Sequence, residues 1–183
     1  YLKGFLNTKQ IDSFQMDLGI EVILQLFSKE GLNNVLCHIE GSIDANTTTS
    51  NSQRIYSLRE EYIKTIDNVI TFLQGKNPSL ARQICSRNFL PESSRFNQLD
   101  DMEWAFGIMG MQDKAKHLAT LYLEDLSDFI VECVDENFGF SRYAERLGRS
   151  ANSFDELYQH LQQELTFIDK ITIITFTHII NFY

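Results

Sequence analysis

The chain has 183 residues, of which 43% are hydrophobic and 22% are charged, a composition typical of one globular domain and unlike that of a disordered chain. Its 25 acidic and 16 basic residues give a formal net charge of −9, which argues against a nucleic-acid partner because phosphate binding needs clustered Lys and Arg. Three widely spaced cysteines and the lack of any run of about 18 apolar residues favour buried thiols in a reducing cytoplasm and no membrane span.

The first twenty residues are predicted to form a helix followed by a strand. Residues 1–8 have the apolar spacing of a short amphipathic helix, and Ser13–Leu18 alternates polar and apolar side chains up to Gly19. Asp17 comes at the end of this strand, where open α/β sheets bind ligands, although a simple turn residue would also be found there. Helix and strand together make half of a βαβ unit, so residues 1–20 would be the remnant of a Rossmann-like half-unit.

Both ends of the chain carry apolar residues without a polar boundary. Tyr1 is not a methionine, and the last residues up to Tyr183 are mostly apolar. Natural domains usually end in polar, frayed segments. We therefore expect residues 1–183 to be a single helical domain that is part of a longer protein.

Helical spacing returns after the predicted strand. A helix is predicted over residues 20–30 and ends at Gly31, and a second short helix covers residues 32–39. The polar, aperiodic segment Asp44–Gln53 is predicted to be a loop. One long helix is then expected over Arg54–Gln74.

Turn and capping residues divide the middle of the chain. Gly75 is predicted to be the C′ residue of the preceding helix, and Asn77-Pro78 is a start signal for a helix that runs to about Arg87. Residues 88–99 are expected to be irregular, and a further helix is predicted around Trp104.

The longest predicted helix runs from Asp113 to Asp135 and organises the fold. Its apolar stripe, at steps of three and four, consists of Ala115, Leu118, Ala119, Tyr122, Leu126, Phe129, Ile130 and Cys133. The tail Phe167–Tyr183 fits either a strand or a helix, and its length and spacing favour the helix. The sequence therefore predicts a mainly α protein, a multi-helix bundle around residues 113–135 with at most one or two short strands.

Acidic side chains accumulate along this central helix. They are Glu124, Asp125, Asp128, Glu132, Asp135 and Glu136. Such a set can bind a metal or catalyse proton transfer only in a shared cleft, so a solvated helix face is the favoured interpretation. The four histidines lack metal-ligand spacing, and no catalytic residue or metal ligand is predicted.

Arginines recur at positions Arg142, Arg146 and Arg149, which would place three guanidinium groups on one side of a short helix. A forked donor suits a phosphate or carboxylate ligand, whereas ion pairs with the acidic central helix are the alternative and the favoured interpretation. Arg95 is likewise expected to be an ion-pair partner.

Several stretches together resemble one bacterial subgroup of cobalamin-binding (B12-dependent) radical SAM proteins. They are Tyr1–Leu6, Gln15–Glu21, FLPESSRF (Phe89–Phe96), HLATLYLEDLSDFI (His117–Ile130) and FGFSRYAERL (Phe138–Leu147). In these proteins a helical segment interrupts the N-terminal Rossmann-like module. The resemblance covers essentially the whole chain.

The resemblance implies an accessory, non-catalytic helical region of an Fe–S oxidoreductase, with the remainder of the parent chain as its partner. The parent would use cobalamin, S-adenosylmethionine and a 4Fe–4S cluster, and this chain, which lacks the cysteine triplet, would hold none of them alone. Asp17 would face the cofactor, and Arg142, Tyr143 and Arg146 would contact a ligand. The alternative is a stand-alone α-helical interaction or regulatory module without a cofactor, and an enzyme in its own right is the weakest of the three hypotheses.

Overall fold

The computed structural model describes residues 1–13, 16–40, 48–99, 110–136, 138–139 and 164–182, and the single positions 154, 155, 158 and 162. Within these residues the chain forms helices and short 3₁₀ turns and contains no strand. The predicted mainly α fold is therefore confirmed. None of the described helices is both long and apolar enough to cross a membrane.

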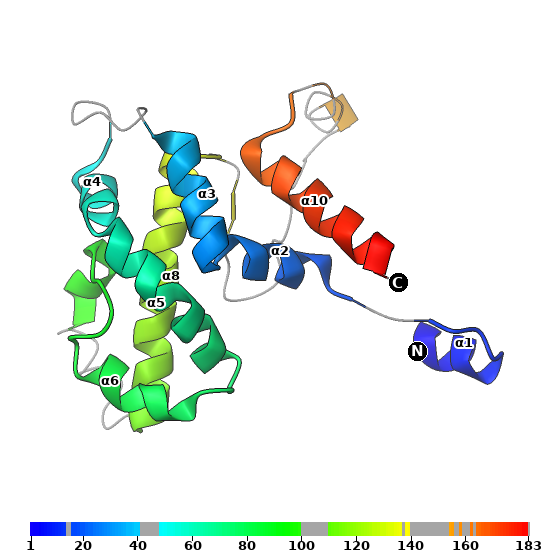
Figure 1. The fold of residues 1–183 in the computed structure, drawn as a ribbon, viewed down its shortest axis with the longest axis horizontal. Helices are drawn as coiled ribbons and strands as arrows, with labels where there is room; N and C mark the ends of the chain where they lie inside the picture. The colour runs from blue at the N-terminus through cyan, green and yellow to red at the C-terminus, as the bar shows by residue number, and fades with distance from the viewer. Residues whose placement is uncertain are drawn as a thin grey trace.

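The helix α8 (Met111–Cys133) is the centre of the bundle, as Figure 1 shows. Its predicted stripe is buried except for the half-buried Cys133, and Ala115, Ala119, Tyr122 and Ile130 are fully inaccessible to solvent. Each large apolar side chain buried in this way stabilises the fold by about 1.5–3 kcal/mol. The central helix is confirmed, and its ends lie two residues before the predicted ones.

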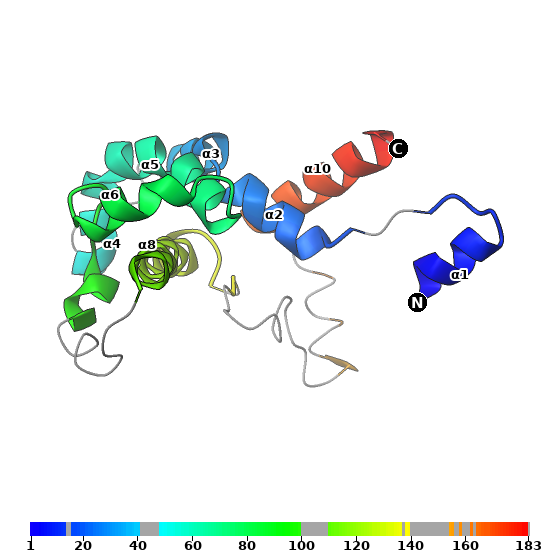
Figure 2. The same cartoon turned by 90° about the horizontal axis from the view of Figure 1, so that it is seen from below.

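The neighbours of α8 come from the middle of the chain. The helices α4 (Ser50–Ser57) and α6 (Ala81–Cys85) and the 3₁₀ turn η2 (Ser94–Gln98) pack directly against it. A second layer consists of α3 (Lys29–Ile39) packed on α5 (Arg59–Leu73). Figure 2 looks nearly along α8 and shows α3, α5 and α6 on one side of it.

Two stacked tyrosines connect these layers. The rings of Tyr62 on α5 and Tyr122 on α8 are 5.0 Å apart at an angle of 27°. The Tyr122 hydroxyl also contacts the Tyr62 carbonyl and the Thr65 hydroxyl, each at 3.0 Å. The buried Tyr122 hydroxyl therefore has the polar partners that buried phenols usually have, whereas the buried Tyr62 hydroxyl has none among the described residues.

The helix α10 (Phe167–Phe182) packs on α2 (Leu18–Leu26), away from α8. Its existence confirms the helical interpretation of the tail. Phe167 stacks on His38 of α3 with ring centroids 4.5 Å apart. The short helix α1 (Leu2–Thr8) is confirmed but buries no residue.

The strand predicted at Ser13–Leu18 is wrong for the residues that the structure describes. Residues 13, 16 and 17 have no regular structure, and Leu18 is the first residue of α2. Asp17 is extended, and its Oδ1 accepts the Ile20 N–H at 3.2 Å. It is therefore the N-cap of a helix, a role that short acidic side chains fill well.

The prediction that Gly31 ends a helix is wrong. Gly31 lies in the first turn of α3. The preceding helix already ends at Leu26, and the Ser28 hydroxyl caps α3 by accepting the Gly31 N–H at 2.9 Å. The Lys29 N–H donates to Asp67 of α5 at 2.9 Å. The first bond caps α3, and the second anchors its start to α5.

Two further boundaries differ from the prediction. Thr49 caps α4 by accepting the Ser52 N–H at 3.3 Å, so this helix begins inside the predicted loop Asp44–Gln53. The single helix predicted over Arg54–Gln74 is divided at Leu58 into α4 and α5. The break lets α4 pack on α8 while α5 packs on α3.

Two turn predictions hold. Gly75 has a positive φ of 76° and follows α5 as its C′ residue, where only glycine avoids strain. Pro78 opens a helical segment, the 3₁₀ turn η1 (Pro78–Leu80), which continues into α6. The helix predicted around Trp104 lies outside the described residues.

The predicted burial of the thiols is wrong. Cys37 is exposed, Cys85 and Cys133 are half-buried, and all three are free. Cys85 and Cys133 are the last residues of α6 and α8, where neighbouring segments cover them only in part.

Candidate functional site

The most developed polar cluster lies where α8 meets η2 and the start of α4. Its centre is Asp125, which is 0% exposed although a solvated face was predicted for the acidic residues of α8. The prediction fails because Asp125 is seven residues after Leu118 and four before Phe129, within the apolar stripe itself.

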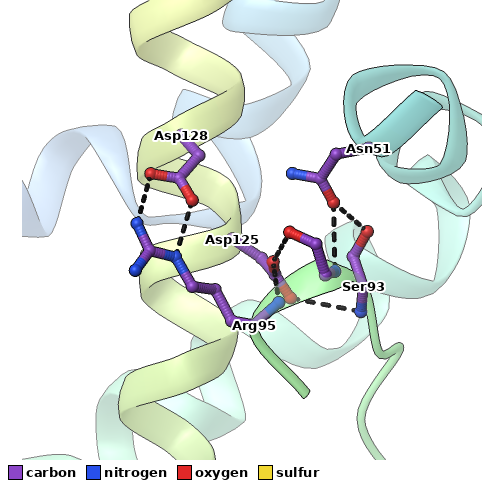
Figure 3. A network of polar contacts seen from close by, with 6 residues as sticks. Asn51, Ser93, Arg95, Asp125 and Asp128 are labelled. Carbon is purple, nitrogen blue, oxygen red and sulfur yellow. Dashed lines mark hydrogen bonds and ion pairs between the residues drawn. The ribbon is translucent and has the colours of Figure 1, made fainter. Parts of the chain in front are cut away.

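Both carboxylate oxygens of Asp125 accept backbone N–H groups of the incoming chain. Oδ2 accepts the Ser93 N–H at 3.1 Å, and Oδ1 accepts the Arg95 N–H at 3.0 Å, as drawn in Figure 3. The Ser94 hydroxyl also donates to Oδ1 at 3.5 Å. Asp125 thus closes the open N-terminal end of η2.

Burial raises the pKa of the Asp125 carboxyl to about 6, although the N–H groups of Arg95 and Ser93 act in the opposite direction. The desolvation of the charged form therefore outweighs its hydrogen bonds.

Arg95 forms a second connection to α8. Its Nε and Nη2 donate to the two oxygens of Asp128 at 2.7 and 2.8 Å, which confirms the predicted ion pair. The two side chains are 46% and 40% exposed. A pair this open to solvent contributes less than about 1 kcal/mol, so it orients Arg95 more than it stabilises the fold.

A third carboxylate of α8 binds the start of α4. Glu132 accepts the Thr49 N–H at 2.6 Å, the Thr49 hydroxyl at 2.7 Å and the Ser52 hydroxyl. Burial pushes the pKa of Glu132 upward, but the hydrogen bonds from Ser52 and Thr49 together leave it below the ordinary value.

Asn51 of α4 completes the cluster from the other side. Its Oδ1 accepts the Ser94 N–H at 3.0 Å and the Ser93 hydroxyl, as Figure 3 shows. Next to it, an open cleft of about 420 Å³ lies between α4 on one side and η2 with the segment before it on the other. We call the set of Asn51, Ser93, Asp125 and the Arg95–Asp128 pair the η2 clasp.

Of the residues predicted to face a cofactor or a ligand, the structure describes only Asp17, which does not belong to the η2 clasp. Asp17 is exposed and caps α2, and Arg142, Tyr143 and Arg146 lie outside the described residues. Among the described residues, no three His, Cys, Asp or Glu side chains lie close enough to hold a metal. Two members of the clasp have a sequence signal, Arg95 as a predicted ion-pair partner and Asp125 by its position within the apolar stripe, whereas Asn51 and Ser93 have none.

The pKa of Asp125 predicts how stability depends on pH. Because this pKa is about 6 in the folded state and 3.8 ordinarily, the folded protein binds the extra proton between these values. The contribution of Asp125 is therefore complete below pH about 4 and is lost as the pH rises through about 6. Asp125→Asn cannot titrate, so the stability advantage of the wild type over this variant should fall by about 1 kcal/mol from pH 5 to pH 7.

Urea unfolding of both proteins across this pH range measures the change. Glu132→Gln is the control, because the pKa of Glu132 lies below its ordinary value of 4.5, so its contribution should stay constant between pH 5 and pH 7 and be lost only at lower pH. An advantage of wild type over Asp125→Asn that grows from pH 5 to pH 7 would contradict the raised pKa.

Comparisons with protein-family models, with curated proteins and with solved structures find no match for this chain. The resemblance to radical SAM proteins therefore stays a prediction that rests on the residues quoted for it. The η2 clasp and the adjoining cleft are defined by the geometry of the chain alone.

Proposed function

We propose that this chain is an accessory, non-catalytic helical region of a cobalamin-dependent radical SAM Fe–S oxidoreductase, where it covers the cofactor module or shapes substrate access. The supporting observation is the use of the α8 carboxylates. Asp125, Asp128 and Glu132 each bind backbone or side-chain donors that hold neighbouring segments in place. Their hydrogen bonds are those of a scaffold, which matches the role that the resemblance implies.

The surface that would face the rest of the parent protein is the outer side of α10. Ile173, Ile174 and Phe176 are 49%, 59% and 50% exposed, and no acidic or basic residue other than His178 follows Lys170 in this helix. Because these side chains are already about half covered, covering the rest stabilises a contact by about 1 kcal/mol each. The inner side of α10 already packs on α2, so the outer side is the one left for another protein surface.

The assignment is tested in the parent protein with Ile174→Lys combined with Phe176→Lys. Charges on this face should prevent docking, so we expect cobalamin retention through gel filtration and turnover to fall at least about tenfold. Met111→Lys is the matched control, because Met111 is also about half exposed but lies at the start of α8, far from α10. Unchanged retention and turnover in the double variant would contradict the role of this face.

The parent protein must also carry a CxxxCxxC triplet for its cluster. A parent that lacks this triplet would remove the radical SAM assignment. The apolar side of α10 would then favour the second function, an α-helical module that docks another protein without a cofactor. In that case the same double variant should abolish the protein contact, and neither the wild type nor the variant should contain cobalamin.

A further inference from the structure

The open cleft beside the η2 clasp is separate from the α10 face. It lies between the first turns of α4 and the turn that leads into η2, on the opposite side of the bundle from α10. Its walls carry two arginines, Arg54 and Arg87, and a single acidic residue, Glu92. In a chain with a net charge of −9, these three residues together leave one positive charge at this position.

The two arginines of the cleft differ in their partners. Arg87 binds the Glu92 carboxylate through Nη2 at 2.6 Å and through Nε, which neutralises that pair. Arg54 donates its Nε to the backbone carbonyl of Glu92 at 2.8 Å, a bond that fixes the guanidinium on the cleft wall. Neither ion pair found among the described residues involves Arg54, so its Nη1 and Nη2 have no carboxylate partner there.

Asn51 supplies a second donor in a fixed orientation. Its Oδ1 already accepts both the Ser93 hydroxyl and the Ser94 N–H, which determines which end of the amide is the oxygen. The Nδ2 group is consequently a donor, and it has no acceptor among the residues that the structure describes. Asn51 and Arg54 both line the cleft and are one helical turn apart on α4.

We propose that this cleft binds an oxyanion, the carboxylate or phosphate group of a small ligand, through the guanidinium of Arg54 and the amide of Asn51. A planar guanidinium presents two parallel N–H donors that match a carboxylate or phosphate, and an amide N–H adds a third bond. The Arg54–Glu92 and Asn51–Ser93 bonds hold both donors in place before the ligand arrives, which reduces the entropy lost on binding.

Titration of the isotope-labelled protein with sodium phosphate, and separately with sodium acetate, tests the proposal at constant ionic strength. We expect saturable shifts of the Asn51 and Ser94 backbone amides with a dissociation constant of about 1–10 mM for at least one anion. Which anion binds more tightly identifies the ligand group as phosphate or carboxylate.

Two variants and one control assign the binding to this cleft. Arg54→Gln removes the fork, and Asn51→Asp keeps the acceptor used by Ser93 and Ser94 while replacing the donor by a negative oxygen, so each should weaken binding at least about tenfold. Arg82→Gln removes a similarly exposed arginine of α6 that does not line the cleft and should leave binding unchanged. Thermal unfolding of each variant checks that it is folded.

If neither phosphate nor acetate gives saturable shifts in the wild type at about 50 mM, the proposal is overturned. An equal loss of binding in Arg82→Gln would also overturn it. The affinity for the anion would then depend on the net charge of the protein and not on Arg54 and Asn51. Retained affinity in folded Asn51→Asp would exclude the amide as a donor.

Discussion

Gly31→Ala is expected to lower the free energy of unfolding by about 3 kcal/mol, the upper end of the range for overpacked sites. A Cβ built at Gly31 would lie 2.1 Å from the Gln25 carbonyl oxygen and 2.4 Å from that of Leu26. Both obstacles are backbone atoms at the end of α2, so no side-chain rotation can relieve the contact. The start of α3 would have to move away from α2, and the buried side chains Leu26 and Leu32 would lose packing.

Equilibrium urea unfolding followed by far-UV circular dichroism measures this effect. Gly4→Ala is the matched control, because a Cβ at Gly4 on α1 meets nothing within 4 Å. Alanine is the better helix former, so the control should change stability by less than about 1 kcal/mol and in the stabilising direction. A loss below about 1 kcal/mol for Gly31→Ala would mean that α2 and α3 do not approach each other this closely.

Gly31 also shows that the sequence alone does not reveal which structural role a glycine has. A glycine after an apolar helical pattern predicts a helix end, and Gly75 fulfils this prediction with its positive φ. Gly31 follows the same pattern but is needed for a close approach between two helices. The residue type is identical in both cases, and only the tertiary contact distinguishes them.

The elements that the sequence predicts well are those decided by local periodicity. The helix α8 and the tail helix α10 have long apolar patterns, and their positions are confirmed within a few residues. The break at Leu58 and the cap at Thr49 were missed because packing against α8 determines them. The strand at Ser13–Leu18 was wrong because short alternation cannot be told from the start of a capped helix.

The candidate site could be predicted only in part. The Arg95 ion pair was expected, since an arginine in an acidic chain usually finds a carboxylate. Asp17 caps α2, a local role, and its predicted cofactor contact stays a prediction. The partners of Asp125 come from residues about thirty positions earlier, so no local pattern contains them. The roles of Arg142 and Arg146 concern residues outside the described part and stay predictions.

Asp125→Ala is expected to lower the free energy of unfolding by about 2–3 kcal/mol near neutral pH. The substitution leaves the N–H groups of Ser93 and Arg95 without their acceptors. The orphaned Ser93 donor is buried and costs about 1–3 kcal/mol, and the part-buried Arg95 donor adds a smaller loss. Burial of the charged Asp125 carboxylate is itself unfavourable, as its raised pKa indicates, and the substitution removes this cost. The expected loss of stability is therefore smaller than the orphaned donors alone would give.

Amide hydrogen exchange adds a readout that a simple loss of packing would not give. The Ser93 and Arg95 amides should exchange faster in Asp125→Ala by a larger factor than amides in the middle of α5, because the contact that protects them is removed directly. Asp128→Ala is the matched control three residues further along α8. Its ion pair with Arg95 is nearly half exposed, so the expected loss is below about 1 kcal/mol, with the Ser93 amide still protected.

Equal losses in the two variants would contradict the central role assigned to Asp125. The energetic difference between them follows from burial and from the donors that each binds, because Asp125 accepts backbone N–H groups and Asp128 accepts an exposed guanidinium of the same short segment. When the exposed Asp128 is removed, water can hydrogen-bond to the Arg95 guanidinium in its place. Loss of the buried aspartate leaves the buried Ser93 N–H without a partner, so the attachment of η2 to α8 depends on an acidic residue for which a solvated helix face was predicted.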